Sequence, residues 1–117
     1  MKQLIPFLFL FLFSCKEKLP PVPGDVIAFE KMKLIMTDIH ISDAVAETNA
    51  QKGEDERAQV QHNNEQIFRN HGISKDEFLK SFQFYESNPA LLNKMYDEIL
   101  NELSKREEAE GKSDSKK

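Results

Sequence analysis

The sequence predicts an all-α protein, a small bundle of about four helices with short connections. Between residues 26 and 103, large apolar residues recur at spacings of three and four, the period of one helix face. Residues that begin and end helices stand between these segments. Outside residues 1–14, no stretch alternates apolar and polar residues as a half-buried strand would. A chain of 117 residues has room for one small domain.

The first predicted helix runs from about Val26 to Asn49, with Asp25 as its N-cap. One face collects the apolar residues Ala28, Phe29, Met32, Ile35, Met36, Ile39 and Ala46. A second apolar strip lies on nearly the opposite side and consists of Ile27, Leu34, Ile41 and Val45. A helix that is apolar on two sides is buried on two sides, so this helix sits in the middle of its domain or offers its second strip to a partner.

A loop and then a weaker helix over residues 56–70 follow, and the next junction carries the clearest local signals. Gly72 fits a helix C-cap. Residues 74–77 form a capping box, with Ser74 at the N-cap and Glu77 at the N3 position. Ile73 and Phe78 stand at the two positions of a hydrophobic staple. The third helix is therefore predicted to begin just after Ser74.

Asn88-Pro89 ends the third helix and begins a fourth, with Asn at the N-cap and Pro at N1. The fourth helix carries apolar residues as far as Leu103. We place the helical domain at residues 26–105. Residues 106–117 are charged and contain Gly and Ser, which predicts a disordered tail.

The N-terminus predicts export. Lys2 precedes ten apolar residues, 4–13, half of what spans a bilayer and typical of a signal peptide. Leu12-Phe13-Ser14-Cys15 resembles the lipobox of bacterial lipoproteins. We expect residues 1–14 to be removed between Ser14 and Cys15. Cys15 would then carry covalent diacylglycerol and an N-acyl lipid, and no other cofactor is expected.

Residues 15–25 read as the lipidated cysteine and a proline-rich tether, in which three prolines fall within four residues. Lys16, directly after the cysteine, is not the aspartate that retains enteric lipoproteins in the inner membrane, and that resemblance favours the outer membrane. Lys16-Glu17-Lys18 also resembles part of a surface-export signal of Bacteroidota lipoproteins. The periplasmic side and the cell surface both stay open.

Composition argues against several classes of function. Removing residues 1–14 takes away Lys2 and no acid, which changes the net charge from −4 to −5. An acidic domain without a basic stripe is a poor nucleic-acid binder, so no nucleic-acid partner is expected. The single cysteine is the predicted lipid site, and no serine stands in a nucleophile elbow. The four glycines are scattered and form no phosphate-binding loop. We expect no enzymatic activity.

Two clusters could carry chemistry. Asp38, His40, Asp43 and Glu47 lie on the first helix, the last three on one side, and form a candidate polar site. We interpret them as a solvated polar edge and expect no metal site, since at most three ligands are supplied. A set of aromatic residues on the third and fourth helices is interpreted as core: Phe78, Phe82, Phe84, Tyr85 and Tyr96. Phe84 is expected to be partly exposed.

A family resemblance rests on an ordered set of short pieces. They are an apolar helix with Asp38-Ile39-His40 ending near residues 44–47, His71-Gly72-Ile73-Ser74 with Phe78, Ser81 and Tyr85, Asn88-Pro89, and Met95-Tyr96 through Leu103. The set covers most of residues 26–103 and resembles a family of small Bacteroidota lipoproteins, domain of unknown function 4296. The resemblance implies a helical, lipobox-bearing protein and leaves function open.

The sequence thus predicts a non-catalytic accessory or scaffold lipoprotein of the cell envelope, bound to the membrane by its lipid and to another envelope protein. The predicted partner face is the second strip of the first helix. The alternative is a lipoprotein that binds a small ligand or a metal, through the aromatic residues or the edge at His40.

Overall fold

A computed structural model describes residues 19–114, which form four helices and no strand, so the all-α prediction is confirmed. The helices are α1 (Phe29–Ala50), α2 (Glu56–Asn70), α3 (Lys75–Glu86) and α4 (Pro89–Asp114). The predicted signal peptide, the cleavage point after Ser14 and the lipidated Cys15 lie outside the described residues, as do residues 115–117.

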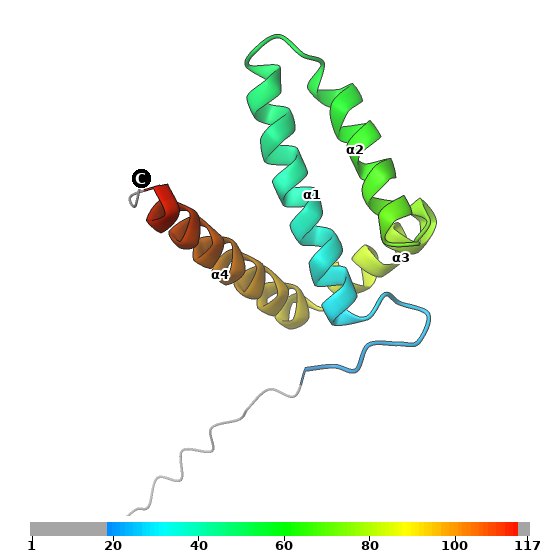
Figure 1. Ribbon diagram of the computed structural model, residues 1–117. Helices are drawn as coiled ribbons and strands as arrows, with labels where there is room; N and C mark the ends of the chain where they lie inside the picture. Colours follow the sequence, from blue (N-terminus) through cyan, green and yellow to red (C-terminus); the bar gives the residue numbers. More distant parts are fainter. Residues whose placement is uncertain (1–18, 115–117) are drawn as a thin grey trace, which may run out of the picture.

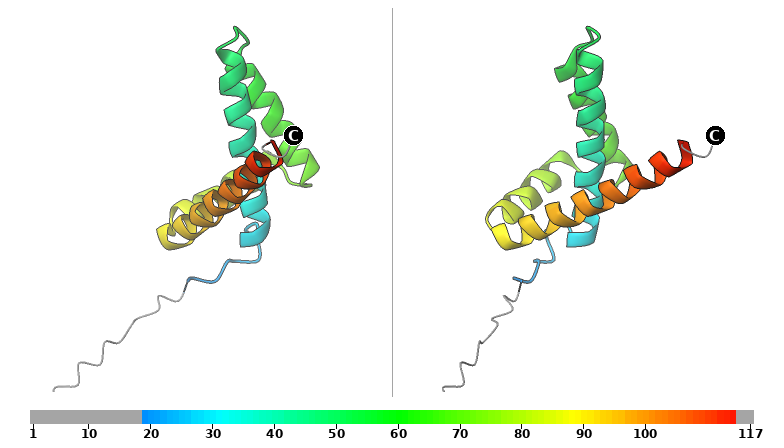
Figure 2. Two further views of the ribbon diagram at one scale, coloured as in Figure 1. Left: turned by 60° about the vertical axis from the view of Figure 1, so that its left-hand side comes forward. Right: turned by 90° about the vertical axis from the view of Figure 1, so that its left-hand side faces the viewer.

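The four helices form an open arrangement around α1. α1 and α2 run side by side as an antiparallel hairpin (Figure 1). α3 follows at the lower end of that hairpin, and α4 crosses the first half of α1 (Figure 2). The second half of α4 then leads away from the hairpin, so α1 has a helix beside it on the α4 side only near its N-terminus.

α1 begins three residues later than the sequence predicted, and Asp25 is not its N-cap. Ala28 stands at the N-cap without any capping side chain. The carboxylate of Asp25 instead accepts a 2.6 Å hydrogen bond from Lys80 of α3, which lowers the pKa of Asp25. The prediction was wrong because a distant cation competes for this carboxylate.

The junction between α2 and α3 follows the predicted local signals. Gly72 adopts φ +67°, a left-handed conformation that favours glycine. The N–H groups of Gly72 and Ile73 donate to the carbonyls of Arg69 and Phe68, which is the Schellman motif. Ser74 Oγ then accepts from the N–H of Glu77 at 3.0 Å and caps α3 as predicted.

The start of α4 at Pro89 also agrees with the prediction, but Asn88 does not cap it through its side chain. Asn88 Nδ2 donates to the carbonyl oxygen of Phe84 at 2.7 Å and so closes the end of α3. The backbone carbonyl of Asn88 accepts from Leu91 and Leu92 and begins the helical hydrogen bonding of α4.

The end of α4 differs from the prediction of a disordered tail from residue 106. The helix continues to Asp114, and all its residues from Ser104 onward are exposed. Arg106 donates to Glu102 at 2.9 Å, one turn earlier, and such pairs support a solvated helix. Local interactions of this kind, rather than packing, hold the last part of α4.

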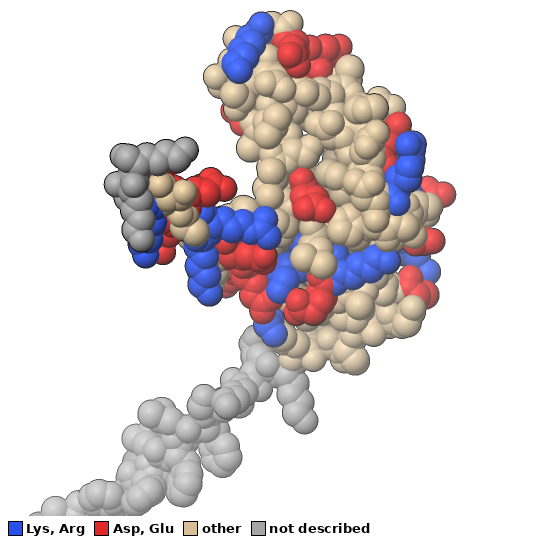
Figure 3. All heavy atoms as spheres, viewed as in Figure 1, with Lys and Arg blue, Asp and Glu red and all other residues tan. Residues whose placement is uncertain are grey.

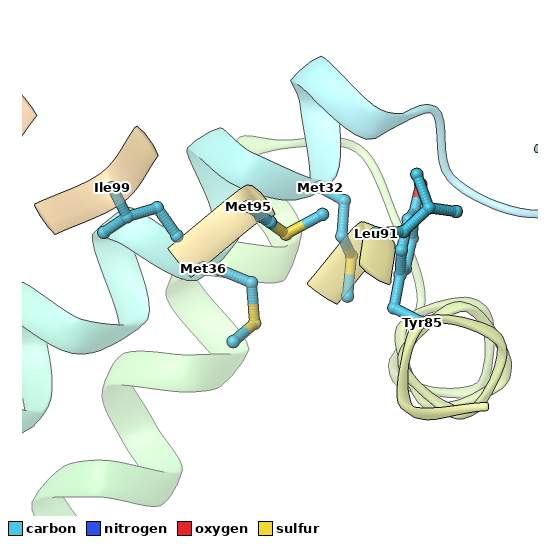
Figure 4. Close-up of a cluster of buried hydrophobic side chains, with 6 residues drawn as sticks. All are labelled: Met32, Met36, Tyr85, Leu91, Met95 and Ile99. Atoms are coloured by element: carbon cyan, nitrogen blue, oxygen red, sulfur yellow. The ribbon is translucent and has the colours of Figure 1, made fainter. Parts of the chain in front are cut away.

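The core lies where α1 meets the other helices. The larger cluster joins α1 to α3 and α4 and consists of Met32, Met36, Tyr85, Leu91, Met95 and Ile99 (Figure 4). A smaller cluster joins α1 to α2 through Ile35, Ile67 and Phe68. Of the predicted inner face of α1, Met32, Ile35, Met36 and Ala46 are buried, Phe29 and Ile39 are partly buried, and Ala28 is exposed before the helix. α1 supplies side chains to both clusters.

The last residues before α1 are docked on the body. Val22, Val26 and Ile27 pack against the larger cluster. Both backbone groups of Ile27 are held by α3, because its N–H donates to Ser81 Oγ at 2.9 Å and its carbonyl accepts from the Tyr85 hydroxyl at 2.7 Å. Only the part of the predicted tether before Val22 can therefore act as a free spacer.

Candidate functional site

Three apolar residues of α1 lie on one face and are exposed. The exposed fractions are 49% for Leu34, 40% for Ile41 and 50% for Val45. We call these three residues the α1 face. They span twelve residues of helix, or about 16 Å along its axis. Ile27, the fourth residue of the predicted strip, precedes α1 and packs against the core, so it does not belong to this face.

The α1 face separates two hollows. One, of about 460 Å³, lies between α1 and α2 and is lined by Ile41, Val45, Ile67 and the polar residues around them. The other, of about 510 Å³, lies between α1 and α4, where Ile41, Ala44 and Val45 face Leu103. It occupies part of the notch between α4 and the hairpin in Figure 3. Ile41 and Val45 line both hollows, whereas Leu34 lines neither. We call the two hollows together, with Ile41 and Val45 between them, the trough.

The α4 wall of the trough is acidic. Arg106, Glu107 and Glu110 line it. The guanidinium of Arg106 is already paired with Glu102 at 2.9 Å. Glu107 and Glu110 take part in none of the ion pairs between described residues. The wall therefore carries two carboxylates that form no ion pair with another described side chain.

The polar residues predicted as a candidate site point in different directions. Asp38 faces α2, where its carboxylate lies 2.7 Å from Nε2 of His71. The ring of His40 lies on the α4 side, 5.6 Å from that of Tyr96 between centroids. Glu47 is exposed, and Asp43 has one buried oxygen without a hydrogen-bond partner. Within residues 19–114, no group of three or more potential metal ligands comes together.

The aromatic residues pack as predicted. Tyr85 is fully buried, with Phe29 and Phe84 against it at centroid distances of 6.5 and 5.3 Å. Phe78 lies between Phe68 and Phe82, at 4.8 and 5.9 Å. Phe84 is partly buried, in agreement with its predicted partial exposure. These rings join α3 to the helices on either side of it.

Two functional contacts escaped the sequence reasoning. The pair between Asp38 and His71 joins the middle of α1 to the end of α2, and nothing in the spacing of the two residues indicates it. The contact of Ser81 and Tyr85 with Ile27 had a weak signal, since two residues four apart share one helix face. That spacing could not reveal a partner 54 or 58 residues away.

Comparison with known protein families identifies the family of this chain. A family model described as Domain of unknown function (DUF4296) matches residues 23–109. The chain belongs to this family. The DUF4296 match takes in the docked segment before α1, all of α1, α2 and α3, and α4 as far as residue 109. No curated protein and no solved structure matches the chain. None of the helices in residues 19–114 is both long and apolar enough to cross a membrane.

Proposed function

We propose that this DUF4296 chain is a non-catalytic accessory or scaffold lipoprotein of the cell envelope. Lipid on Cys15 anchors it to the membrane, most simply the outer membrane, and the α1 face binds another envelope protein. The observation that carries the proposal is the exposure of Leu34, Ile41 and Val45 on one face of the helix that also builds the core. Exposed apolar side chains that share one helix face are typical of interaction sites.

Burial elsewhere on α1 supports this interpretation of its exposed face. Ile35, next to Leu34 in the chain, is fully buried, and so is Met32 one turn earlier. The helix thus has an inner face that is buried in the core and a separate outer face that is partly exposed. Residues 19–114 leave 40–50% of each side chain of the outer face exposed, and a bound molecule would bury the remainder.

The lipid anchor is supported by the sequence around Cys15, and a substitution tests it. Cys15→Ser removes the thiol that accepts diacylglycerol. We expect cells that express Cys15→Ser to lose metabolic labelling of the protein with a fatty acid and to release it from membranes or leave it uncleaved. Persistent lipid labelling of Cys15→Ser would reject the anchor.

Co-purification tests the binding of a partner. Membranes are solubilised in mild detergent, a C-terminally tagged chain is captured, and proteins recovered with it are quantified by mass spectrometry. We expect one envelope protein in stoichiometric amount. Recovery of the chain alone, across several mild detergents, would reject the scaffold function.

A second candidate function, binding of a small amphiphile, is favoured by a hollow of about 410 Å³ between α2 and α3. Phe68, Phe78 and Leu79 give it an apolar lining. Arg57 and Lys75 outnumber the one carboxylate there, that of Glu65, so the lining is net positive. Such a site suits an anion with an apolar tail. Native mass spectrometry of the purified protein tests this candidate. A bound small molecule that is lost in Leu79→Asp supports it, and a protein of bare mass rejects it.

A further inference from the structure

We propose that the segment docked on the α1 face is an amphipathic helix of a partner protein, apolar on one side and bearing Lys or Arg along the edge next to α4. The inference rests on the proposed function and adds the chemistry of the partner. It follows from the length of the face, the backbone groups around it and the charge of its wall.

The α1 face is long enough for a docked helix, and the trough gives its second half, at Ile41 and Val45, a wall on each side. Leu34 and Val45 lie about 16 Å apart along α1, which matches about three turns of a second helix. Ile41 and Val45 lie between the hollow on the α2 side and the one on the α4 side. Apolar side chains at spacings of three and four could enter both hollows, as in other helix-in-groove complexes.

The backbone around the trough favours a helix over an extended segment. An added strand gains its affinity from the free N–H and C=O groups of a sheet edge. The trough is built from α1, α2 and α4, whose backbone groups are paired within their own helices, and residues 19–114 contain no strand. A helix brings its own backbone hydrogen bonds and needs only side-chain contacts here.

The charge of the α4 wall favours basic residues on the edge of the partner helix that faces it. Glu107 and Glu110 line the hollow next to α4, and the one basic residue beside them, Arg106, is bound to Glu102. A docked helix therefore meets two carboxylates that form no ion pair with a described side chain, and the helix itself would partly shield them from water. Lys or Arg on that edge would be attracted, and Asp or Glu would be repelled.

The same charges argue against two other occupants. A second copy of this chain, paired antiparallel through the face, would place the acidic wall opposite the acidic wall of its partner. A bilayer with anionic headgroups would repel Glu107 and Glu110. Both occupants are distinguishable outcomes of the experiment below.

Site-specific crosslinking in the intact cell tests the inference. A photoreactive phenylalanine analogue replaces Val45 in the full-length lipidated chain, and mass spectrometry sequences the crosslinked peptide. We expect a peptide from another envelope protein, with apolar residues at helical spacing and Lys or Arg on one edge. Glu107→Lys should lower the crosslink yield roughly tenfold. Glu108→Lys makes the same charge change at the next residue, which does not line the hollow, and should leave the yield unchanged.

The other outcomes overturn the inference in different ways. The basic helix is rejected if the crosslinked segment of the other protein is acidic or extended, or if Glu107→Lys leaves the crosslink yield unchanged. The proposed scaffold function would still hold in either case. An adduct of twice the mass identifies a second copy, and an adduct with lipid identifies the membrane. If Val45 gives no adduct and co-purification also recovers the chain alone, the proposed function fails together with the inference.

Discussion

The hydroxyl of Tyr85 donates a 2.7 Å hydrogen bond to the carbonyl oxygen of Ile27, 58 residues earlier in the chain. One turn before it on α3, Ser81 Oγ accepts from the N–H of the same Ile27 at 2.9 Å. Both α3 residues are buried. Two side chains of α3 therefore hold both backbone groups of Ile27, two residues before α1, and fix the segment that leads into the helix.

Removing the Tyr85 hydroxyl should weaken the domain without changing its core. In Tyr85→Phe the carbonyl of Ile27 loses its donor, and we expect the free energy of unfolding to fall by about 1 to 2 kcal/mol. Urea denaturation followed by circular dichroism measures this. Tyr96→Phe is the control, since the Tyr96 hydroxyl makes no hydrogen bond within residues 19–114. Equal losses in the two variants would contradict the assigned role.

Alkaline pH should destabilise the protein through the same residue. Burial raises the pKa of Tyr85 above its usual value of 10.0. The unfolded chain therefore releases this proton first, and the stability that neutral Tyr85 provides is complete below about pH 10 and lost as the pH rises further. The stability advantage of the wild type over Tyr85→Phe should shrink between pH 9 and pH 11. A constant difference over that interval would refute the linkage.

Truncation of two adjacent residues of α1 should change the stability by very different amounts. Ile35 is fully buried, and Leu34 is 49% exposed. Ile35→Ala should cost about 2 to 5 kcal/mol, because it removes buried methyl groups and leaves a cavity. Leu34→Ala should change stability by less than about 1 kcal/mol. Thermal unfolding of the two variants compares them directly, and a large loss in Leu34→Ala would place that residue in the core.

Shortening α4 tests where the packed domain ends. All residues from Ser104 to Asp114 are exposed, although they are helical. Ending the chain after Ser104 should therefore shift the melting temperature by only about 2 °C or less. A fall of more than about 5 °C would show that the last turns of α4 stabilise the body.

Local signals predicted the helices well, and long-range contacts set the remaining details. The glycine at 72 and the capping box at 74 act within a few residues, so the sequence alone was sufficient to place the start of α3. Asp25 has the right type and position for an N-cap, but its choice of Lys80 depends on how α3 packs beside the tether. The predicted tail from residue 106 was wrong because charged residues can continue an exposed helix through pairs such as Arg106 with Glu102.

Only part of the candidate site could be predicted from the sequence. Periodicity located the second apolar strip of α1, but it could not distinguish burial inside the domain from exposure to a partner. Leu34 and Val45 are about half exposed. At Val45 this agrees with the course of α4, which has turned away from the second half of α1. The acidic wall could not be foreseen, because residues 107 and 110 were predicted to be disordered.

One measurement tests the central claim, that the α1 face binds an envelope protein, most directly. Ile41→Asp is introduced into the full-length chain, and both the melting temperature and the recovery of the co-purifying protein are determined. Leu100→Asp is the matched control, because Leu100 is 62% exposed and lines neither hollow of the trough. We predict that both variants melt within about 3 °C of the wild type and that only Ile41→Asp loses the partner. Unfolding of Ile41→Asp, or full retention of the partner, would contradict the account.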